Sequence, residues 1–318
     1  MFKWLEEFRQ RRALRPGRTK EERFKRRYRV FQVGFFLMLG LFGFTIYANY
    51  DYWVFRLLIA NNYVFTDALD ELYSRHLHEE NRQSFHRDFD RVVISVVTGA
   101  LSEINNDRFT YLYAPQEIQA VRTADRAVAR RVSVEALNED TVHLFIPNIS
   151  RITREFVYEH KEYMAQYSNL ILDLRGNYGG WLMDAHRIAS LFTPRDAVLS
   201  QEEARMNLFT RTITSNGDQF FHFDNVIVLQ DRRTASAAET LILALREHVP
   251  NLVTIGYRTV GKGIGQVTIP LTGGYAVRAT VINVLGPTGE SIHLVGIYPD
   301  IPTDPEMDMI EQALALLR

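Results

Sequence analysis

The sequence predicts an α/β protein with a mostly parallel sheet, preceded by a helical segment and one N-terminal transmembrane helix. Three observations predict this arrangement. After about residue 140, short β-branched runs alternate with amphipathic stretches; residues 66–103 space their apolar side chains by three and four; and residues 30–48 carry no charge. We divide the 318 residues into a basic tail (1–29), a transmembrane helix (30–48), a helical segment (49–122) and an α/β core (123–318).

The N-terminus combines positive charge with an apolar stretch. The first 29 residues contain 12 Lys or Arg against four Glu, and in Val30–Ala48 the polar side chains are Gln32 and Thr45, with Tyr47 near its end. Nineteen helical residues at about 1.5 Å each nearly span a hydrocarbon layer of about 30 Å. Because positive flanks stay cytoplasmic, we expect a single-pass anchor in the cell membrane, with the N-terminus in the cytoplasm and the residues after about 50 outside it.

Alternatives for this stretch fit less well. The apolar run exceeds the usual h-region of a cleaved signal peptide, and no clear small-x-small site follows it. A buried core helix would not need the basic flank. We therefore predict an uncleaved anchor.

Composition excludes several classes of function. The net charge of −1 argues against a general nucleic-acid binder, and the absence of cysteine excludes disulfides, thiolate metal sites and cysteine nucleophiles. His76 and His78 are two residues apart, so on a helix they face different directions and make a poor metal site. We expect no cofactor and no metal.

The core pattern reads as strand, helix, strand repeated, which indicates a largely parallel sheet. The predicted strands are Val142–Ile146, Leu170–Leu174, Val226–Leu229 and Leu252–Ile255, and the predicted helices are Ile152–Gln166, Trp181–Phe192 and Ala237–His248. Residues 266–285 alternate apolar with small or polar side chains and turn at Gly273–Gly274, which predicts a β-hairpin. Chemistry in such sheets gathers in the loops beyond the carboxyl ends of the strands.

Three loops leave such ends. Asp173–Gly180 is glycine-rich, Gln230–Glu239 brings Ser236 to a helix entrance, and Thr254–Gln266 contains Lys262. The third loop looks like a phosphate-binding loop, but Gly263 occupies the hydroxyl position and a hairpin follows, so we reject that reading. Taken singly, the serine fits an N-cap and the lysine a solvated loop residue.

Together the three loops have complementary chemistry. A serine hydroxyl becomes a nucleophile when a base removes its proton, and Lys262 can be that base if burial keeps its amine neutral. Gln266 can orient the amine without adding charge. The N–H groups of Gly180 and Ala237 offer two donors for a developing oxyanion. This is the Ser-Lys form of acyl-transfer catalysis.

At these residues the sequence resembles the carboxyl-terminal processing proteases, also called tail-specific proteases. The motifs "LILDLRGNYGG", "TASAAE", "VGKGIGQ" and "GPTGESIHLVGIYPDI" occur in family order, and "TGALSEINNDRFTYLYAPQEI" resembles the family's helical segment. The likeness covers roughly residues 63–318. It implies a crotonase-like core, Ser236 as nucleophile, Lys262 as general base with Gln266 as its partner, Gly180 and Ala237 as the oxyanion hole, and cleavage of protein substrates outside the cytoplasm.

Three departures from the family pattern stand out. Tyr178 occupies a position that is usually proline or glycine, and Ala238 replaces a common second serine. Relatives carry a PDZ domain between helical segment and core, where this chain has only "TADRAVARRV". Since PDZ domains bind peptide C-termini, we expect substrate choice to come from the cleft, from membrane proximity, or from a partner or adaptor protein.

The sequence thus predicts a membrane-anchored serine endopeptidase acting on protein or peptide substrates. The main alternative is a non-catalytic module that binds a ligand or protein on the same scaffold. A membrane-tethered assembly factor is a third reading. The presence of Ser236, Lys262 and Gln266 together favours the enzyme.

Overall fold

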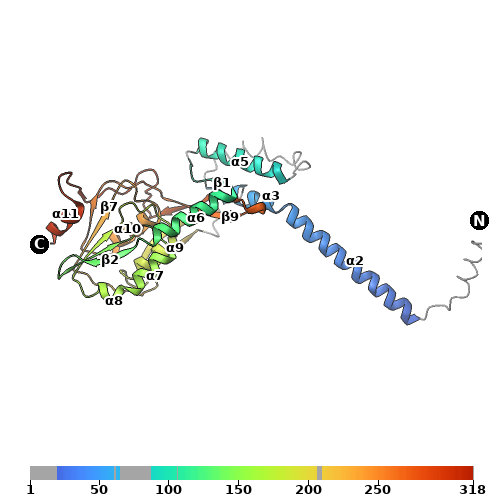
Figure 1. Cartoon of the computed structure of the whole chain (residues 1–318), viewed down its shortest axis with the longest axis horizontal. Coiled ribbons are helices and arrows are strands. Elements are labelled where there is room, and N and C mark those ends of the chain that lie inside the picture. Colours follow the sequence, from blue (N-terminus) through green and yellow to red (C-terminus); the bar gives the residue numbers. More distant parts are fainter. Residues whose placement is uncertain (1–19, 61, 65–86, 106, 206–209, 318) are drawn as a thin grey trace, which may run out of the picture. The chain divides into compact units, whose positions relative to one another are not determined.

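The computed structural model describes residues 20–60, 62–64, 87–105, 107–205 and 210–317 (Figure 1). The chain forms two compact units, residues 1–51 and 52–318. The first 19 residues of the predicted basic tail, together with His76 and His78, lie outside the described residues.

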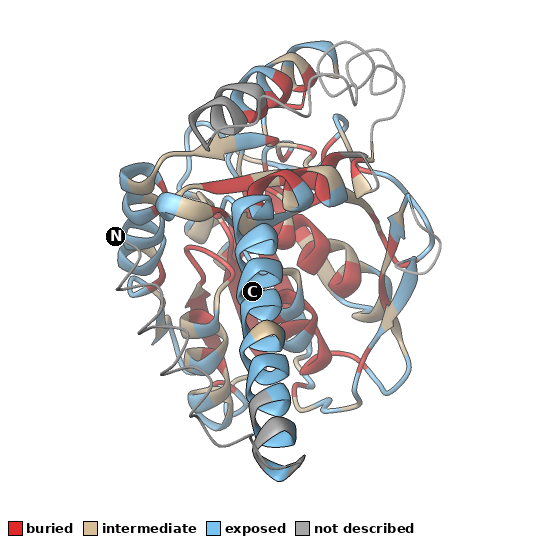
Figure 2. Ribbon diagram, turned by 90° about the vertical axis from the view of Figure 1, so that its right-hand side faces the viewer, coloured by how far each residue is buried: buried red, intermediate tan, exposed pale blue. Residues whose placement is uncertain are grey.

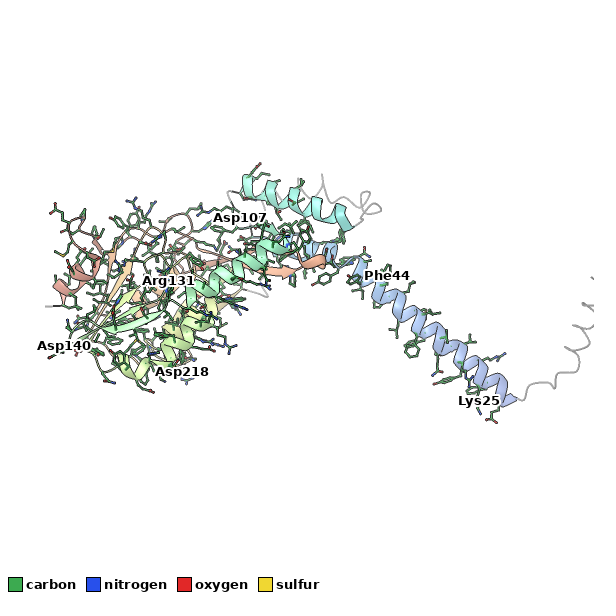
Figure 3. The ribbon with its side chains drawn as sticks, viewed as in Figure 1. Lys25, Phe44, Asp107, Arg131, Asp140 and Asp218 are labelled. Atoms are coloured by element: carbon green, nitrogen blue, oxygen red, sulfur yellow. The ribbon has the colours of Figure 1, made fainter. Side chains whose placement is uncertain are left out.

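The main described element of the first unit is helix α2, Lys20–Ala48. Its stretch Arg27–Ala48 has 22 residues and a mean hydropathy of 1.9, which suffices to cross a membrane by length and composition. Its large apolar side chains, including Phe44 (Figure 3), are exposed, and Figure 2 shows exposure along almost the whole helix. An apolar N-terminal helix is therefore present as predicted.

The larger sheet of the second unit has, within the described residues, six strands in the order β11-β8-β7-β4-β3-β2. All neighbours pair in parallel except β2 and β3, which are antiparallel. The strands are β2 Ser133–Ala136, β3 Thr141–Phe145, β4 Asn169–Asp173, β7 Asn225–Gln230, β8 Leu252–Gly256 and β11 Ile301–Pro302. Every residue of β4 is buried, as expected for a strand covered on both faces.

Helices cover both faces of this sheet. Successive residues of a strand face opposite sides, and in β4 Leu170 and Leu172 join one core cluster while Ile171 joins another. The first cluster contains apolar residues of four helices, α7 Arg151–Glu159, α8 Lys161–Met164, α9 Leu182–Ser190 and α10 Ala237–His248. The second contains Ala313 of α11, Met309–Leu316. The class is a mixed α/β fold.

A second, antiparallel sheet follows the order β1-β10-β5-β6, with β9 also paired to β10. Its strands are β1 Tyr111–Tyr113, β5 Val198–Ala204, β6 Arg211–Thr214, β9 Ile264–Pro270 and β10 Ala276–Leu285. β9 and β10 form the hairpin predicted around Gly273–Gly274. Between α2 and β1 the described residues include the helices α3 Tyr50–Phe55, η1 Arg56–Ala60 and α5 Arg87–Ile104. Leu101 of α5 and Ile59 of η1 share a core cluster with Val277 of β10.

Two parts of the secondary structure differ from expectation. The single helix predicted over Ile152–Gln166 is wrong, because the chain breaks at His160 (φ −100°, ψ 5°) between α7 and α8. The His160 ring stacks on Phe156 at 4.0 Å, and its Nδ1 lies 2.9 Å from the Phe156 carbonyl oxygen, which favours the break. The stretch treated as a connection, "TADRAVARRV", lies mostly within helix α6, Pro115–Ala129. The domain division at residues 122 and 123 falls inside α6 and stays a prediction.

Because β4 lies at the centre of the core, truncating it should destabilise the second unit. We expect Leu172→Ala to lower the free energy of unfolding by about 2–5 kcal/mol, from lost apolar burial and the cavity left behind. Denaturant unfolding of the full chain in detergent measures this. Leu316→Ala, at a side chain 51% exposed, is the control and should change stability by less than about 0.5 kcal/mol. Equal effects of the two variants would contradict this account of the core.

Candidate active site

Ser236 lies on a sharp turn between the end of β7 and the start of α10. Its backbone has φ 57° and ψ −124°, a left-handed conformation that is costly for a residue with a side chain. The turn is held by neighbouring loops, because the Thr234 hydroxyl donates to the Leu174 carbonyl (2.9 Å) and the Ala235 N–H to the Asn177 carbonyl (2.9 Å). Ser236 is the N-cap residue of α10, and its backbone N–H donates to the side chain of Glu239, three residues further on.

A buried carboxylate, that of Glu239, joins this turn to the loop of Lys262. Its Oε2 accepts the N–H of Ser236 at 2.7 Å and that of Lys262 at 2.9 Å. Its Oε1 accepts the N–H of Gly261 at 2.7 Å and the hydroxyl of Thr259. We call this set of four hydrogen bonds the Glu239 clamp. Charge-assisted bonds of this kind are about twice as strong as neutral ones, so the clamp fixes the two loops against each other.

The glycine-rich loop approaches the serine closely. A Cβ added to Gly179 (φ 99°) would lie 2.7 Å from the Cβ of Ser236, and one added to Gly180 would lie 1.8 Å from the Ile149 carbonyl oxygen. Only glycine therefore fits at either position. The N–H groups of Gly180 and Ala237 donate to no other backbone carbonyl of the described residues. Both donors are thus available to a ligand.

Lys262 lies in the loop between β8 and β9, and its amine sits 4.1 Å from the centroid of the Phe109 ring. Burial lowers its pKa to about 8, helped by the positive charges of Arg278 and Arg108, while the carboxylates of Asp107 and Glu239 oppose the shift. A substantial fraction of this amine is therefore neutral near physiological pH. The amine shares no hydrogen bond with the Ser236 hydroxyl in this structure.

Gln266 is anchored by a second buried carboxylate, Asp107 (Figure 3). Its side-chain amide donates to the hydroxyl of Thr280, its cross-strand neighbour on β10, at 3.4 Å. That hydroxyl in turn donates to Asp107 at 3.2 Å. The same carboxylate accepts the hydroxyls of Tyr63 (3.0 Å) and Thr110 (2.6 Å). The amide of Gln266 is thus directed to Thr280 and makes no hydrogen bond to the lysine amine.

The predicted residues therefore meet only in part. The Glu239 carboxylate joins the turn of Ser236 to the loop of Lys262, and the N–H groups of Gly180 and Ala237 lie close to that turn. The side chains of Lys262 and Gln266 have other partners. The sequence reasoning missed the roles of Glu239, Phe109 and Asp107. A signal for the first existed, because Ser236 followed three residues later by glutamate is a capping-box pattern. No cluster of three or more His, Asp or Glu that could hold a metal occurs in the described parts of the chain.

A strand, a left-handed serine turn, a helix and an adjoining half-buried lysine define a candidate serine acyl-transfer site. Residues 140–303, about half of the chain, match the model of peptidase family S41, and the chain belongs to that family. It is 33% identical over 141 residues to the chloroplastic C-terminal processing peptidase of Tetradesmus obliquus, which is 44% of this chain and 30% of that protein. The chain spans about a third of the length of the curated relatives it matches.

Solved structures agree on the fold. A lipoprotein from Streptococcus agalactiae superimposes with a TM-score of 0.66 at 17% identity, covering 85% of this chain and 96% of that one. The photosystem II D1 C-terminal processing protease gives a TM-score of 0.58 at 18% identity, covering 80% and 92%. At these identities the likeness concerns the fold alone.

The clamp predicts a specific stability effect. In Glu239→Gln an amide N–H replaces one oxygen acceptor, leaving buried N–H donors without a partner, so we expect the free energy of unfolding to fall by about 2–5 kcal/mol. Glu247→Gln, on an exposed position of the same helix, is the matched control and should stay within about 0.5 kcal/mol. Chemical denaturation of both variants makes the comparison, and a Glu239→Gln protein as stable as the control would refute the clamp.

Proposed function

We propose that this chain is a membrane-anchored serine endopeptidase with a crotonase-like core that cleaves polypeptides outside the cytoplasm. The observation that carries the proposal is the Glu239 clamp, which fixes a serine in a left-handed turn beside a loop whose lysine has a pKa near 8. A scaffold that only binds a ligand needs neither the strained serine nor a lysine whose pKa is lowered to about 8. Membership of peptidase family S41 supports the same class of reaction.

The mechanism begins with proton transfer. The neutral amine of Lys262 takes the proton of the Ser236 hydroxyl, and Oγ attacks the carbonyl carbon of the scissile bond. The resulting oxyanion accepts hydrogen bonds from the N–H groups of Gly180 and Ala237, an interaction worth about 2.7–4 kcal/mol per donor. The lysine ammonium then gives its proton to the leaving amine. Water, deprotonated by the same amine, releases the acyl group and restores the serine.

This mechanism requires the lysine amine to leave the Phe109 ring. The contact to the ring, at 4.1 Å, holds the amine by a cation–π interaction worth about 0.5–2 kcal/mol when the amine is charged. A neutral amine loses that attraction and is free to turn toward Ser236. Catalytic hydrogen bonds are often formed only once substrate is bound. In the substrate-bound state the side chain of Gln266 would leave the hydroxyl of Thr280 and form a hydrogen bond with the lysine amine, which it would orient.

The apolar helix α2 suits a single membrane anchor, with the basic residues before it in the cytoplasm. This arrangement would confine the peptidase to substrates near the membrane surface. No PDZ-like segment separates α6 from β2 in the chain, since three residues join them. Substrates would therefore reach the site directly or through a partner protein.

One observation favours the alternative of a non-catalytic binding module on the same scaffold. The Ser236 hydroxyl and the Lys262 amine are not hydrogen-bonded to each other, and the amine instead contacts Phe109. In a binding module this arrangement would be permanent, and the serine loop would simply cradle a ligand.

Variants of the two central residues separate these functions. We expect Ser236→Ala and Lys262→Ala each to abolish cleavage of a flexible protein such as denatured casein. The first removes the nucleophilic hydroxyl and the second removes the base that takes its proton. The thermal transition should stay nearly unchanged in both. Gel analysis of cleavage together with calorimetry in detergent tests this, and undiminished proteolysis in either variant would end the proposal.

The pH dependence follows from the lysine. Since the base must be neutral and its pKa is about 8, kcat/KM should rise about tenfold between pH 7 and pH 9 and then level off. Arg278→Gln removes a positive charge that lowers this pKa, so its profile should move to higher pH. Arg122→Gln, on the exposed face of α6, serves as the control and should leave the midpoint in place. A rate independent of pH over this range would rule out the neutral lysine base.

A further inference from the structure

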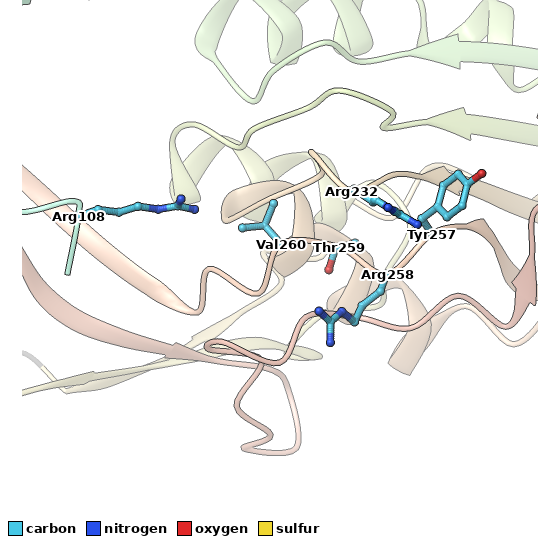
Figure 4. A pocket seen from close by; sticks show the side chains of 6 residues that line it. All are labelled: Arg108, Arg232, Tyr257, Arg258, Thr259 and Val260. Carbon is cyan, nitrogen blue, oxygen red and sulfur yellow. The ribbon is translucent and has the colours of Figure 1, made fainter. Parts of the chain in front are cut away.

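A cavity of about 470 Å³ adjoins the loop of Lys262 (Figure 4). Its wall combines residues from three loops, with Arg108 from the segment before β1, Arg232 from the loop after β7, and Tyr257 to Val260 from the loop after β8. Three of the six lining residues are arginines and none is acidic. We call this cavity the arginine pocket.

Each of the three arginines lies over an aromatic ring. Arg232 lies over Tyr257 at 4.9 Å and Arg258 over Tyr298 at 5.6 Å, while Arg108 lies over its neighbour Phe109 at 5.2 Å. Two other arginines nearby in the sequence do have acidic partners within the described residues: Arg233, next to Arg232, pairs with Asp231, and Arg246 of α10 pairs with Asp300. The pocket arginines form no ion pair with a described residue. Stacking on a ring restricts the motion of each guanidinium group before a ligand arrives. Less conformational entropy is therefore lost when the ligand binds.

The pocket is connected directly to the candidate active site. The Thr259 hydroxyl in its wall donates to Glu239, the centre of the clamp, and the Val260 N–H donates at 3.0 Å to the carbonyl of Thr234, two residues before Ser236. The charge of Arg108 also acts on Lys262, whose pKa it helps to lower. A group bound among the arginines would therefore contact the same loop that the clamp ties to the turn of Ser236.

We propose that the arginine pocket binds a carboxylate of the polypeptide substrate and so selects acidic sequences next to the scissile bond. Guanidinium groups match carboxylates through two parallel hydrogen bonds, and a volume of about 470 Å³ suits one or two acidic residues. The carboxylate has two sources, an Asp or Glu side chain or the C-terminal α-carboxylate. This inference rests on the proposed peptidase function, because the pocket is assigned to its substrate.

The experiment measures binding, which needs no catalysis. Fluorescence anisotropy gives the Kd of labelled peptides for the full-length Ser236→Ala protein in detergent. Three peptides of otherwise equal sequence are compared: one with Asp and Glu residues and a free C-terminus, one with Asn and Gln in their place, and one amidated at the C-terminus. Each is measured with Arg108→Gln, Arg232→Gln and Arg258→Gln added in turn, and with Arg195→Gln, outside the pocket lining, as the matched control.

We expect each pocket substitution to weaken binding of the acidic peptide about tenfold, equal to about 1.4 kcal/mol, and Arg195→Gln to change it less than twofold. Loss of affinity on neutralising the side chains assigns the pocket to Asp or Glu, and loss on amidation assigns it to the α-carboxylate. If all three peptides bind alike, or the pocket variants bind as the Ser236→Ala parent does, the inference is overturned. Arginine-dependent binding, together with a wild-type protein that cleaves no denatured casein, would instead refute the peptidase while leaving the carboxylate pocket in place.

Discussion

The buried carboxylate of Glu239 is the interaction on which the candidate site depends. It belongs to α10, yet three of its four donors, on Thr259, Gly261 and Lys262, come from the loop of Lys262, a separate part of the chain. A buried charge is tolerated only when its hydrogen bonds are satisfied, and here four donors satisfy it. The same requirement that stabilises the carboxylate therefore fixes the distance between the nucleophile turn and the base loop.

The pKa of the Lys262 amine is set by burial and by charged neighbours that act in opposite directions. Burial and two arginines favour the neutral amine, whereas Asp107 and Glu239 favour the charged one, and the pKa of about 8 shows that burial prevails. Asp107 also accepts hydrogen bonds from the hydroxyls of Tyr63, Thr110 and Thr280. It therefore joins the segment before the core to β10, the strand paired with Gln266. The helical segment thus contributes to the electrostatics of the site as well as to packing.

Sequence reasoning located the parts of the site whose signals are local. Helix α10 has the predicted bounds, and the strands β4, β7 and β8 lie within a residue of expectation, because apolar runs and helical spacing are properties of neighbouring residues. Phe109 and Asp107 could not be found this way, since each reaches the site across more than 150 residues of chain. The strands β5 and β6 also escaped, because their pairing partners override weak local preference. The helix break at His160, which a contact to Phe156 favours, was not recognised either. The roles of Ser236, Lys262, Gln266, Gly180 and Ala237 remain predictions.

The central claim is that a neutral lysine activates one serine, and trapping the acyl-enzyme tests it most directly. The full chain is mixed with a peptide thioester at pH 8, quenched in acid and analysed by mass spectrometry after digestion. The account predicts a single acyl group on Ser236 that accumulates in the wild-type protein and is absent from Lys262→Ala. Acylation of a different residue, or equal labelling of Ser236 without the lysine, would contradict it.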